Sequence, residues 1–161
     1  MYTNQRLSEK SRTESGIDID WYFLDPTGQI AIVASAGGLI PDPIVADMDK
    51  LKKMISYFRS LPILSNNIII ENHVLDEIKH YPQQQKDRYL DDLYFMSSRG
   101  FYYFDKIEIN QYFDFSYHLK AKPSIPLIID KSDKRIQEFL PPITLPQNLD
   151  NIKLLSVNEL T

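Results

Sequence analysis

The sequence predicts an α+β fold, with a mostly antiparallel sheet and two or three helices packed on one side of it. Two observations carry this prediction. Short aromatic segments with period-two alternation occur as hairpins or meanders, and apolar stripes with helical spacing lie between them. The length of 161 residues suits one domain with a sizeable core. We expect a frayed lead-in over 1–16 and a single globular domain over 17–161.

The composition excludes several classes of function. The formal net charge of -4 lacks the basic excess of nucleic-acid binders, and it permits a cationic protein partner. The chain has no cysteine, which excludes disulfides, thiolate metal sites and cysteine nucleophiles. Neither a signal-peptide pattern nor an apolar run long enough to span a membrane occurs. We expect a cytoplasmic protein that binds neither nucleic acid nor membrane.

A β-hairpin is predicted near the start of the domain. The aromatic run Trp21–Leu24 is typical of a strand, and the DPTG sequence of Asp25–Gly28 is typical of a tight turn. Ile30, Ile32 and Ala34 then alternate with other residues. This alternation predicts a second strand with one face inward.

The glycine pair Gly37 and Gly38 precedes a predicted helix, as the glycines of a phosphate-binding loop do. The spacing of known phosphate loops is absent, however. In addition, Pro41 and Pro43 remove two N–H donors and Asp42 adds negative charge. We therefore expect a glycine-relaxed strand exit and not an anion site.

Three helical segments are predicted in the first two thirds of the chain. An apolar stripe over Ile44–Phe58 predicts one helix, which Asp42 can cap. The segment Asn66–Pro82 is either a short strand at Ile68–Ile70 followed by a helix or one helix throughout. Gln83–Gly100 is predicted to be a helix that stops at its glycine.

The segment Tyr112–Lys120 shows the cleanest strand pattern in the chain. Its predicted inward set is Phe113, Phe115, Tyr117 and Leu119. Its predicted outward set is Tyr112, Asp114, Ser116, His118 and Lys120. We expect Tyr112, Asp114 and His118 to form a row that binds a protein partner. If helices cover this face instead, the polar groups need internal partners.

The charged residues on the predicted helices indicate solvent-exposed faces and not a catalytic or metal site. Asp87 and Asp91, four residues apart, predict an acidic patch that can also bind a partner. His73, Glu77 and His80 would share one face of a continuous helix, but a solvated face is the favoured interpretation over a zinc site. We predict no catalytic residue, no cofactor and no metal site.

Aromatic crowding is the most distinctive compositional signal, with ten tyrosines and eight phenylalanines. Alternation along strands sends about half of each cluster into the core. Tyrosines stacked across strands or under loops are the favoured interpretation. The alternative is that Tyr22, Tyr112 and either Tyr102 or Tyr103 stay at the surface as recognition anchors.

Several stretches together resemble a family of small bacterial proteins. They are DWYFLDPTGQIAIVASAGG at the first hairpin, SSRGFYYFD at Ser97–Asp105, and KPSIPLIIDKSDKRIQEFL after the strand pattern. The family begins with a similar Asp-Trp-Phe-like hairpin, and some of its members are regarded as immunity-like proteins that accompany bacterial toxins. The resemblance implies such a role and supplies no catalytic residues.

The sequence thus favours a non-enzymatic, cytoplasmic protein-interaction module, with toxin neutralisation as its implied role. The alternative is a small-ligand-binding or enzymatic domain. That alternative places a pocket between sheet and helices near Trp21, Tyr103 and His118.

Overall fold

The computed structural model describes residues 18–36, 38, 40–106 and 116–156. Within them lies one six-stranded sheet of order β1-β2-β4-β5-β3, and β6 pairs with the other end of β5. The strands are β1 (Asp20–Leu24), β2 (Ile30–Ala34), β3 (Ile68–Ile70), β4 (Tyr102–Lys106), β5 (Ser116–Pro123) and β6 (Leu154–Ser156). The β2–β4 pair is parallel and the others are antiparallel, so the predicted α+β fold with a mostly antiparallel sheet is confirmed.

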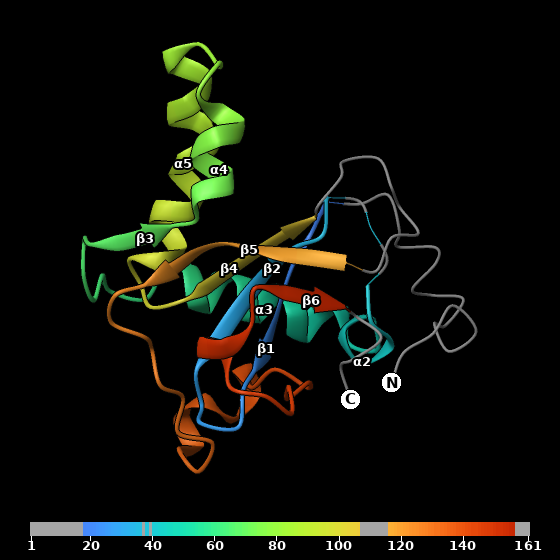
Figure 1. Ribbon diagram of the computed structural model, residues 1–161. Coiled ribbons are helices and arrows are strands. Elements are labelled where there is room, and N and C mark those ends of the chain that lie inside the picture. The colour runs from blue at the N-terminus through green and yellow to red at the C-terminus, as the bar shows by residue number, and fades with distance from the viewer. Residues whose placement is uncertain (1–17, 37, 39, 107–115, 157–161) are drawn as a thin grey trace.

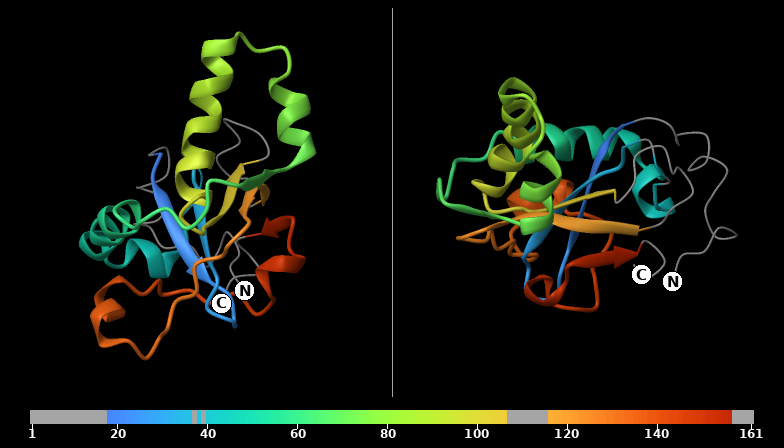
Figure 2. Two further views of the ribbon diagram at one scale, coloured as in Figure 1. Left: turned by 90° about the vertical axis from the view of Figure 1, so that its left-hand side faces the viewer. Right: turned by 45° about the horizontal axis from the view of Figure 1, so that its top comes forward.

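The longer helices pack on one face of this sheet, and Figures 1 and 2 show α4 and α5 as a helical hairpin that projects from it. The helices are α2 (Asp42–Val45), α3 (Met48–Arg59), α4 (Asn72–Ile78) and α5 (Gln83–Ser97), with 3₁₀ helices η2 (Lys134–Phe139) and η3 (Leu149–Asn151). The segment over 66–82 is a strand followed by a helix, which decides between the two alternatives left open by the sequence.

The single helix predicted over 44–58 is two helices, so that prediction was wrong. Asp47 has an extended φ of -140°, and its carboxylate accepts a hydrogen bond from the Lys50 N–H. This is an N-cap, which ends α2 and begins α3. The apolar stripe survives the break, because Ile44 of α2 and Leu51 and Phe58 of α3 are all buried.

The first hairpin is buried on both faces, whereas the alternation of its second strand predicted one inward face. Tyr22 packs on Phe58 of α3 with a ring-centroid distance of 4.8 Å. On the other face, Trp21 packs on Tyr117 of β5 at 6.3 Å. The sequences of β1 (DWYFL) and β2 (IAIVA) are therefore almost continuously apolar, as is usual where a sheet is covered on both sides.

The tyrosines considered as surface anchors are buried. Tyr22, Tyr102 and Tyr103 expose 0%, 2% and 4% of their surface, so the surface alternative is wrong for these residues. Tyr112 lies outside the described residues. Burial of the three described tyrosines agrees with the favoured interpretation of the sequence.

The turn of the hairpin is tied to the C-terminal part of the chain by one buried carboxylate. Oδ1 of Asp25 accepts the backbone N–H groups of Thr27 at 2.8 Å and Gln29 at 2.9 Å. Its Oδ2 accepts the N–H of Leu149, the first residue of η3, at 2.9 Å. Because Asp25 is fully buried, water cannot replace these bonds. Gly28 completes the turn at φ 89°, a conformation that favours glycine.

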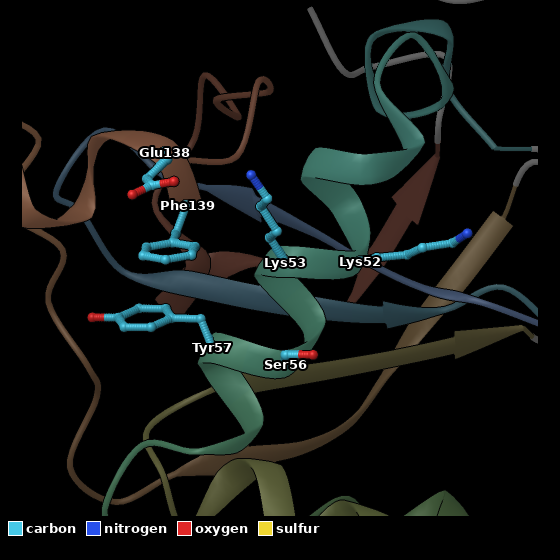
Figure 3. Close-up of a pocket in the computed structure, with 6 residues that line it drawn as sticks. All are labelled: Lys52, Lys53, Ser56, Tyr57, Glu138 and Phe139. Atoms are coloured by element: carbon cyan, nitrogen blue, oxygen red, sulfur yellow. The ribbon is translucent and has the colours of Figure 1, made fainter.

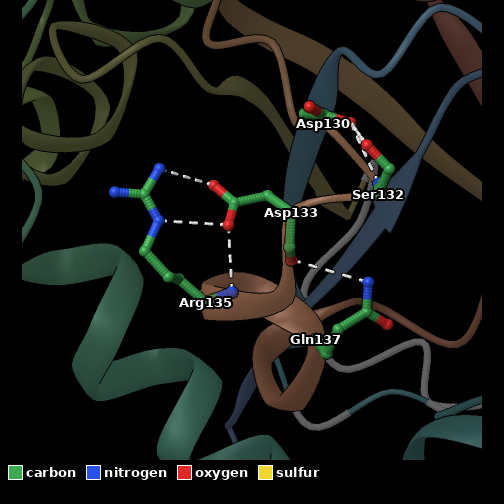
Figure 4. A network of polar contacts seen from close by, with 5 residues as sticks. All are labelled: Asp130, Ser132, Asp133, Arg135 and Gln137. Atoms are coloured by element: carbon green, nitrogen blue, oxygen red, sulfur yellow. Dashed lines mark hydrogen bonds and ion pairs between the residues drawn. The ribbon is translucent and has the colours of Figure 1, made fainter.

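Asp25→Ala should lower the free energy of unfolding by roughly 3–5 kcal/mol, because several buried N–H donors lose their acceptor. Asp130→Ala is the matched control. Figure 4 shows that Asp130 also accepts hydrogen bonds within a turn, from Ser132, but this turn is exposed to solvent. Urea unfolding of both variants measures the difference. Equal losses in the two variants would contradict the structural role of Asp25.

Candidate functional site

Two carboxylates flank a small residue at one end of the sheet. In register, Asp20 of β1 pairs with Ala34 of β2, and Ala34 pairs with Asp105 of β4, so the three side chains share a face. Asp20 and Asp105 are two strand spacings apart, which is about 10 Å. The methyl group of Ala34 does not fill the space between them. A hollow therefore opens on the sheet at this row.

Helix α5 forms the opposite wall of this hollow and turns it into a half-enclosed cavity of about 260 Å³, named the acidic pocket below. The sheet side is lined by Asp18, Asp20, Ala34, Ala36, Tyr103 and Asp105. The helix side is lined by Arg88, Tyr89, Asp92 and Leu93. Four aspartates thus face one arginine among the described lining residues.

Asp105 is the carboxylate most affected by its surroundings. Burial raises its pKa from 3.8 to about 6, although a hydrogen bond from the Lys106 N–H and the charge of Lys120 act in the opposite direction. Oδ1 accepts that hydrogen bond at 2.7 Å. Among the described residues, no hydrogen bond to its second oxygen is formed. A bound cation would therefore find an acceptor here that the fold does not use.

Asp20 and Asp92 hold a guanidinium group at the side of the pocket. A terminal nitrogen of Arg59 lies 2.8 Å from Asp20 Oδ2, and the other lies 3.5 Å from Asp92 Oδ1. Burial raises the pKa of Asp20, and the hydrogen bond and charge of Arg59 only partly offset this effect. The site thus already contains one example of a guanidinium between two of its carboxylates.

Tyr103 adds a hydroxyl group to the lining of the pocket. Its side chain is 4% exposed overall. Burial and the nearby charges of Asp92, Asp20 and Asp105 raise the pKa of this hydroxyl, which stays protonated. It is therefore a neutral group that can exchange hydrogen bonds with water or with a ligand in the pocket.

The arrangement suits an organic cation better than a metal ion. Calcium ligands must lie within roughly 2.3–2.6 Å of the ion. The Asp20 and Asp105 backbones are about 10 Å apart, on opposite sides of Ala34. Within the described ranges, no group of three or more histidines and carboxylates is placed to hold a metal ion. A guanidinium group, with five N–H donors on three nitrogens, reaches acceptors that are further apart than those around a single metal ion.

His118 lies on the same face, next to Asp105 in register, but this part of the sheet is covered by helices. Its ring stacks on His73 of α4 with a centroid distance of 4.6 Å. Burial and the charge of Lys120 lower the pKa of His118. Lys120, predicted to face outward, is 4% exposed and pairs with Glu77 at 3.5 Å. The covered alternative of the sequence analysis is the observed one here.

The other predicted partner-binding residues divide into two groups. Tyr112 and Asp114 lie outside the described residues. Asp87 and Asp91 are exposed on α5, and Asp91 directly precedes the pocket residue Asp92. The predicted acidic patch therefore adjoins the acidic pocket, and its role in partner binding stays a prediction.

Two of the three residues considered for a zinc site, His73 and Glu77, have other partners in the structure. The Nε2 atom of His73 lies 2.8 Å from the Leu119 carbonyl oxygen, and Glu77 pairs with Lys120.

The sequence analysis did not identify Asp20, Asp92 and Asp105 as site residues. The available signal was weak: Asp20 and Asp105 stand at strand ends, and only the β2–β4 pairing brings them together.

A larger hollow of about 550 Å³ lies between α3 and η2, but it is open and shallow (Figure 3). The rings of Tyr57 and Phe139 stack on each other there at 4.2 Å. Lys52 extends away from this ring pair in Figure 3. Because the two rings stack on each other and the hollow is open to solvent, it is a weaker candidate for a binding site than the acidic pocket.

Comparisons with protein-family models, with curated proteins and with solved structures found no match. The resemblance to immunity-like bacterial proteins therefore stays a prediction. Across the described part of the chain, none of the helices has both the length and the apolar character needed to cross a membrane.

Asp105→Asn should stabilise the protein at pH 8 by roughly 1–3 kcal/mol, because it removes a charge that burial disfavours. The folded-state pKa of about 6 exceeds the ordinary value of 3.8, so the wild-type protein loses stability as the pH rises between these values. The gain in the variant should therefore disappear below pH 4.

Thermal and urea unfolding across this pH range would measure the gain. Asp76→Asn, an exposed carboxylate on α4, is the control and should show no such pH-dependent difference. A variant that is destabilised at pH 8 would show that Asp105 has a stabilising partner and is not held at a cost.

Proposed function

We propose that this protein is a non-enzymatic protein-interaction module that binds a basic side chain of its partner in the acidic pocket. The observation that carries the proposal is that Asp105, Asp20 and Tyr103 line one small cavity. Carboxylates that cost folding energy are a common feature of binding sites. Binding of a cation would offset that cost, because it supplies the missing charge and hydrogen bonds.

The size of the pocket supports a side chain as its occupant. Sites for drug-sized ligands have volumes of roughly 300–1,000 Å³. The acidic pocket, at about 260 Å³, lies below this range and suits the end of one arginine or lysine side chain. The side chain of a partner that enters such a pocket is typical of the anchor residues of protein interfaces.

The resemblance to immunity-like proteins supports a toxin as the partner and the cytoplasm as the place of action. An acidic pocket fits this role, because a basic active-site or surface residue of the toxin would be its complement. The overall charge of -4 would also speed the encounter with a cationic protein.

A small free amine is the second candidate ligand. The position of the pocket, between the sheet and α5, favours this candidate. The small-ligand alternative predicted a pocket between sheet and helices near three residues, and one of them, Tyr103, lines the acidic pocket. Of the other two, Trp21 is on the opposite face of the sheet, whereas His118 is next to the pocket residue Asp105 in register and stacks on His73 of α4.

Selection of random peptides displayed on phage tests the proposal without knowledge of the partner. Peptides selected on the wild-type protein should be enriched in arginine or lysine. Ala34→Leu should remove this enrichment, because the larger side chain fills the pocket without removing any charge. Circular dichroism and thermal unfolding would show that the variant is folded.

Asp76→Asn is the matched control, since it removes an exposed carboxylate that is not among the pocket-lining residues, and it should leave the selection unchanged. Selection of peptides without basic residues, or equal enrichment on Ala34→Leu, would overturn the proposal. Binding of free acetyl-arginine-amide together with failure of all peptides would favour the small-amine candidate.

A further inference from the structure

We propose that an open groove beside the acidic pocket is the second half of the partner-binding surface, and that it takes apolar side chains next to the partner's basic residue. The inference rests on the proposed function, because the pocket supplies the first contact. The groove, of about 500 Å³, lies between α5 and the loop before β3. Its lining includes Ile63, Asn66, Asp91, Tyr94, Phe95 and Arg99.

The walls of the groove expose large apolar side chains to solvent. Ile63 on the loop is 50% exposed, and Tyr94 on α5 is 47% exposed. Phe95 also lines the groove and is partly buried. Neighbouring apolar side chains that remain open to water are typical of surfaces that bind another protein.

Hydrogen bonds hold the groove in shape before any partner binds. Arg99 Nε donates to the Leu61 carbonyl oxygen at 2.8 Å, and its guanidinium stacks 3.7 Å from the centre of the Phe95 ring. The Leu64 N–H donates to the Ser98 carbonyl oxygen at 2.8 Å. The loop is thus fixed to α5, and a partner would not have to order it on binding.

The groove and the acidic pocket meet on α5. Asp91 lines the groove, and the next residue, Asp92, lines the pocket. Arg59 connects the two, because it pairs with Asp92 at 3.5 Å and lies 5.5 Å from the centre of the Phe95 ring. A single binding surface therefore runs from the carboxylates to the apolar walls.

This continuity and its charge indicate one kind of occupant, a segment of a partner protein with a basic residue close to apolar ones. The segment from Arg88 on α5 to its C-cap Ser98 is about 15 Å long. An extended peptide covers that length with roughly five residues. The charges of Asp91 and Arg99 balance within the groove, so the preference for a basic residue comes from the acidic pocket beside it.

Short synthetic peptides can test the pairing of the two sites. The probes are acetyl-Arg-Gly-Leu-Leu-amide and longer forms with two to four glycines, each with a serine counterpart in which both leucines are replaced. Binding is measured by titration followed in amide NMR spectra. At one spacing or more, the leucine peptide should bind the wild-type protein about tenfold more tightly than its serine counterpart.

Two variants separate the contributions. Tyr94→Ala should remove the advantage of the leucine peptide and leave the serine peptide unaffected, and Ile63→Ser on the opposite wall should do the same. Ala34→Leu should weaken both peptides. Because Ile63 and Tyr94 are about half exposed, their substitution should leave the fold intact.

The failures of the two proposals are distinguishable. If the serine peptides bind at the pocket but leucine gives no advantage at any spacing, the groove proposal is overturned and the proposed function stands. If no peptide binds, the proposed function is overturned, and the groove proposal, which rests on it, is overturned as well. A concentration-dependent dimer that Tyr94→Ala dissociates would show that the groove is occupied by a second copy of this chain, which also overturns the proposal.

Discussion

Burial of the central sheet on both faces is the constraint on which the rest of the structure depends. Helices α3, α4 and α5 cover the face of Tyr22 and Tyr103, while Trp21 and Tyr117 fill the opposite one. Polar groups that point into such layers need partners. Asp25 finds them in the turn and in η3, and Lys120 finds them in Glu77 and Tyr89. Asp105 has one oxygen that accepts no hydrogen bond from the described residues, and it lines the acidic pocket.

That contrast separates structural from functional polar residues. The buried Asp25 carboxylate stabilises the fold, because each of its oxygens accepts hydrogen bonds from the chain. The Asp105 carboxylate has a raised pKa and a free acceptor. Evolution tolerates such a cost where a ligand repays it, and the small Ala34 beside Asp105 leaves room for that ligand.

The sequence predicted what depends on local pattern. Period-two aromatics, the DPTG turn and the apolar stripe gave the hairpin and the buried face of α3. It could not predict the acidic pocket, because that site depends on the parallel pairing of β2 with β4, whose residues are about seventy positions apart. The alternation of apolar and polar residues along β5 also could not show that α4 covers His118. The same alternation occurs whether the polar face of a strand is covered by a helix or exposed to solvent.

A direct titration of the Asp105 carboxyl carbon by NMR tests the central claim, that this largely buried carboxylate is part of a cation-binding site. The account predicts a midpoint at about pH 6 in the free protein. It also predicts that saturating acetyl-arginine-amide moves the midpoint toward lower pH, because a bound cation favours the ionised carboxylate. A midpoint near 3.8, unchanged by the ligand, would contradict the account.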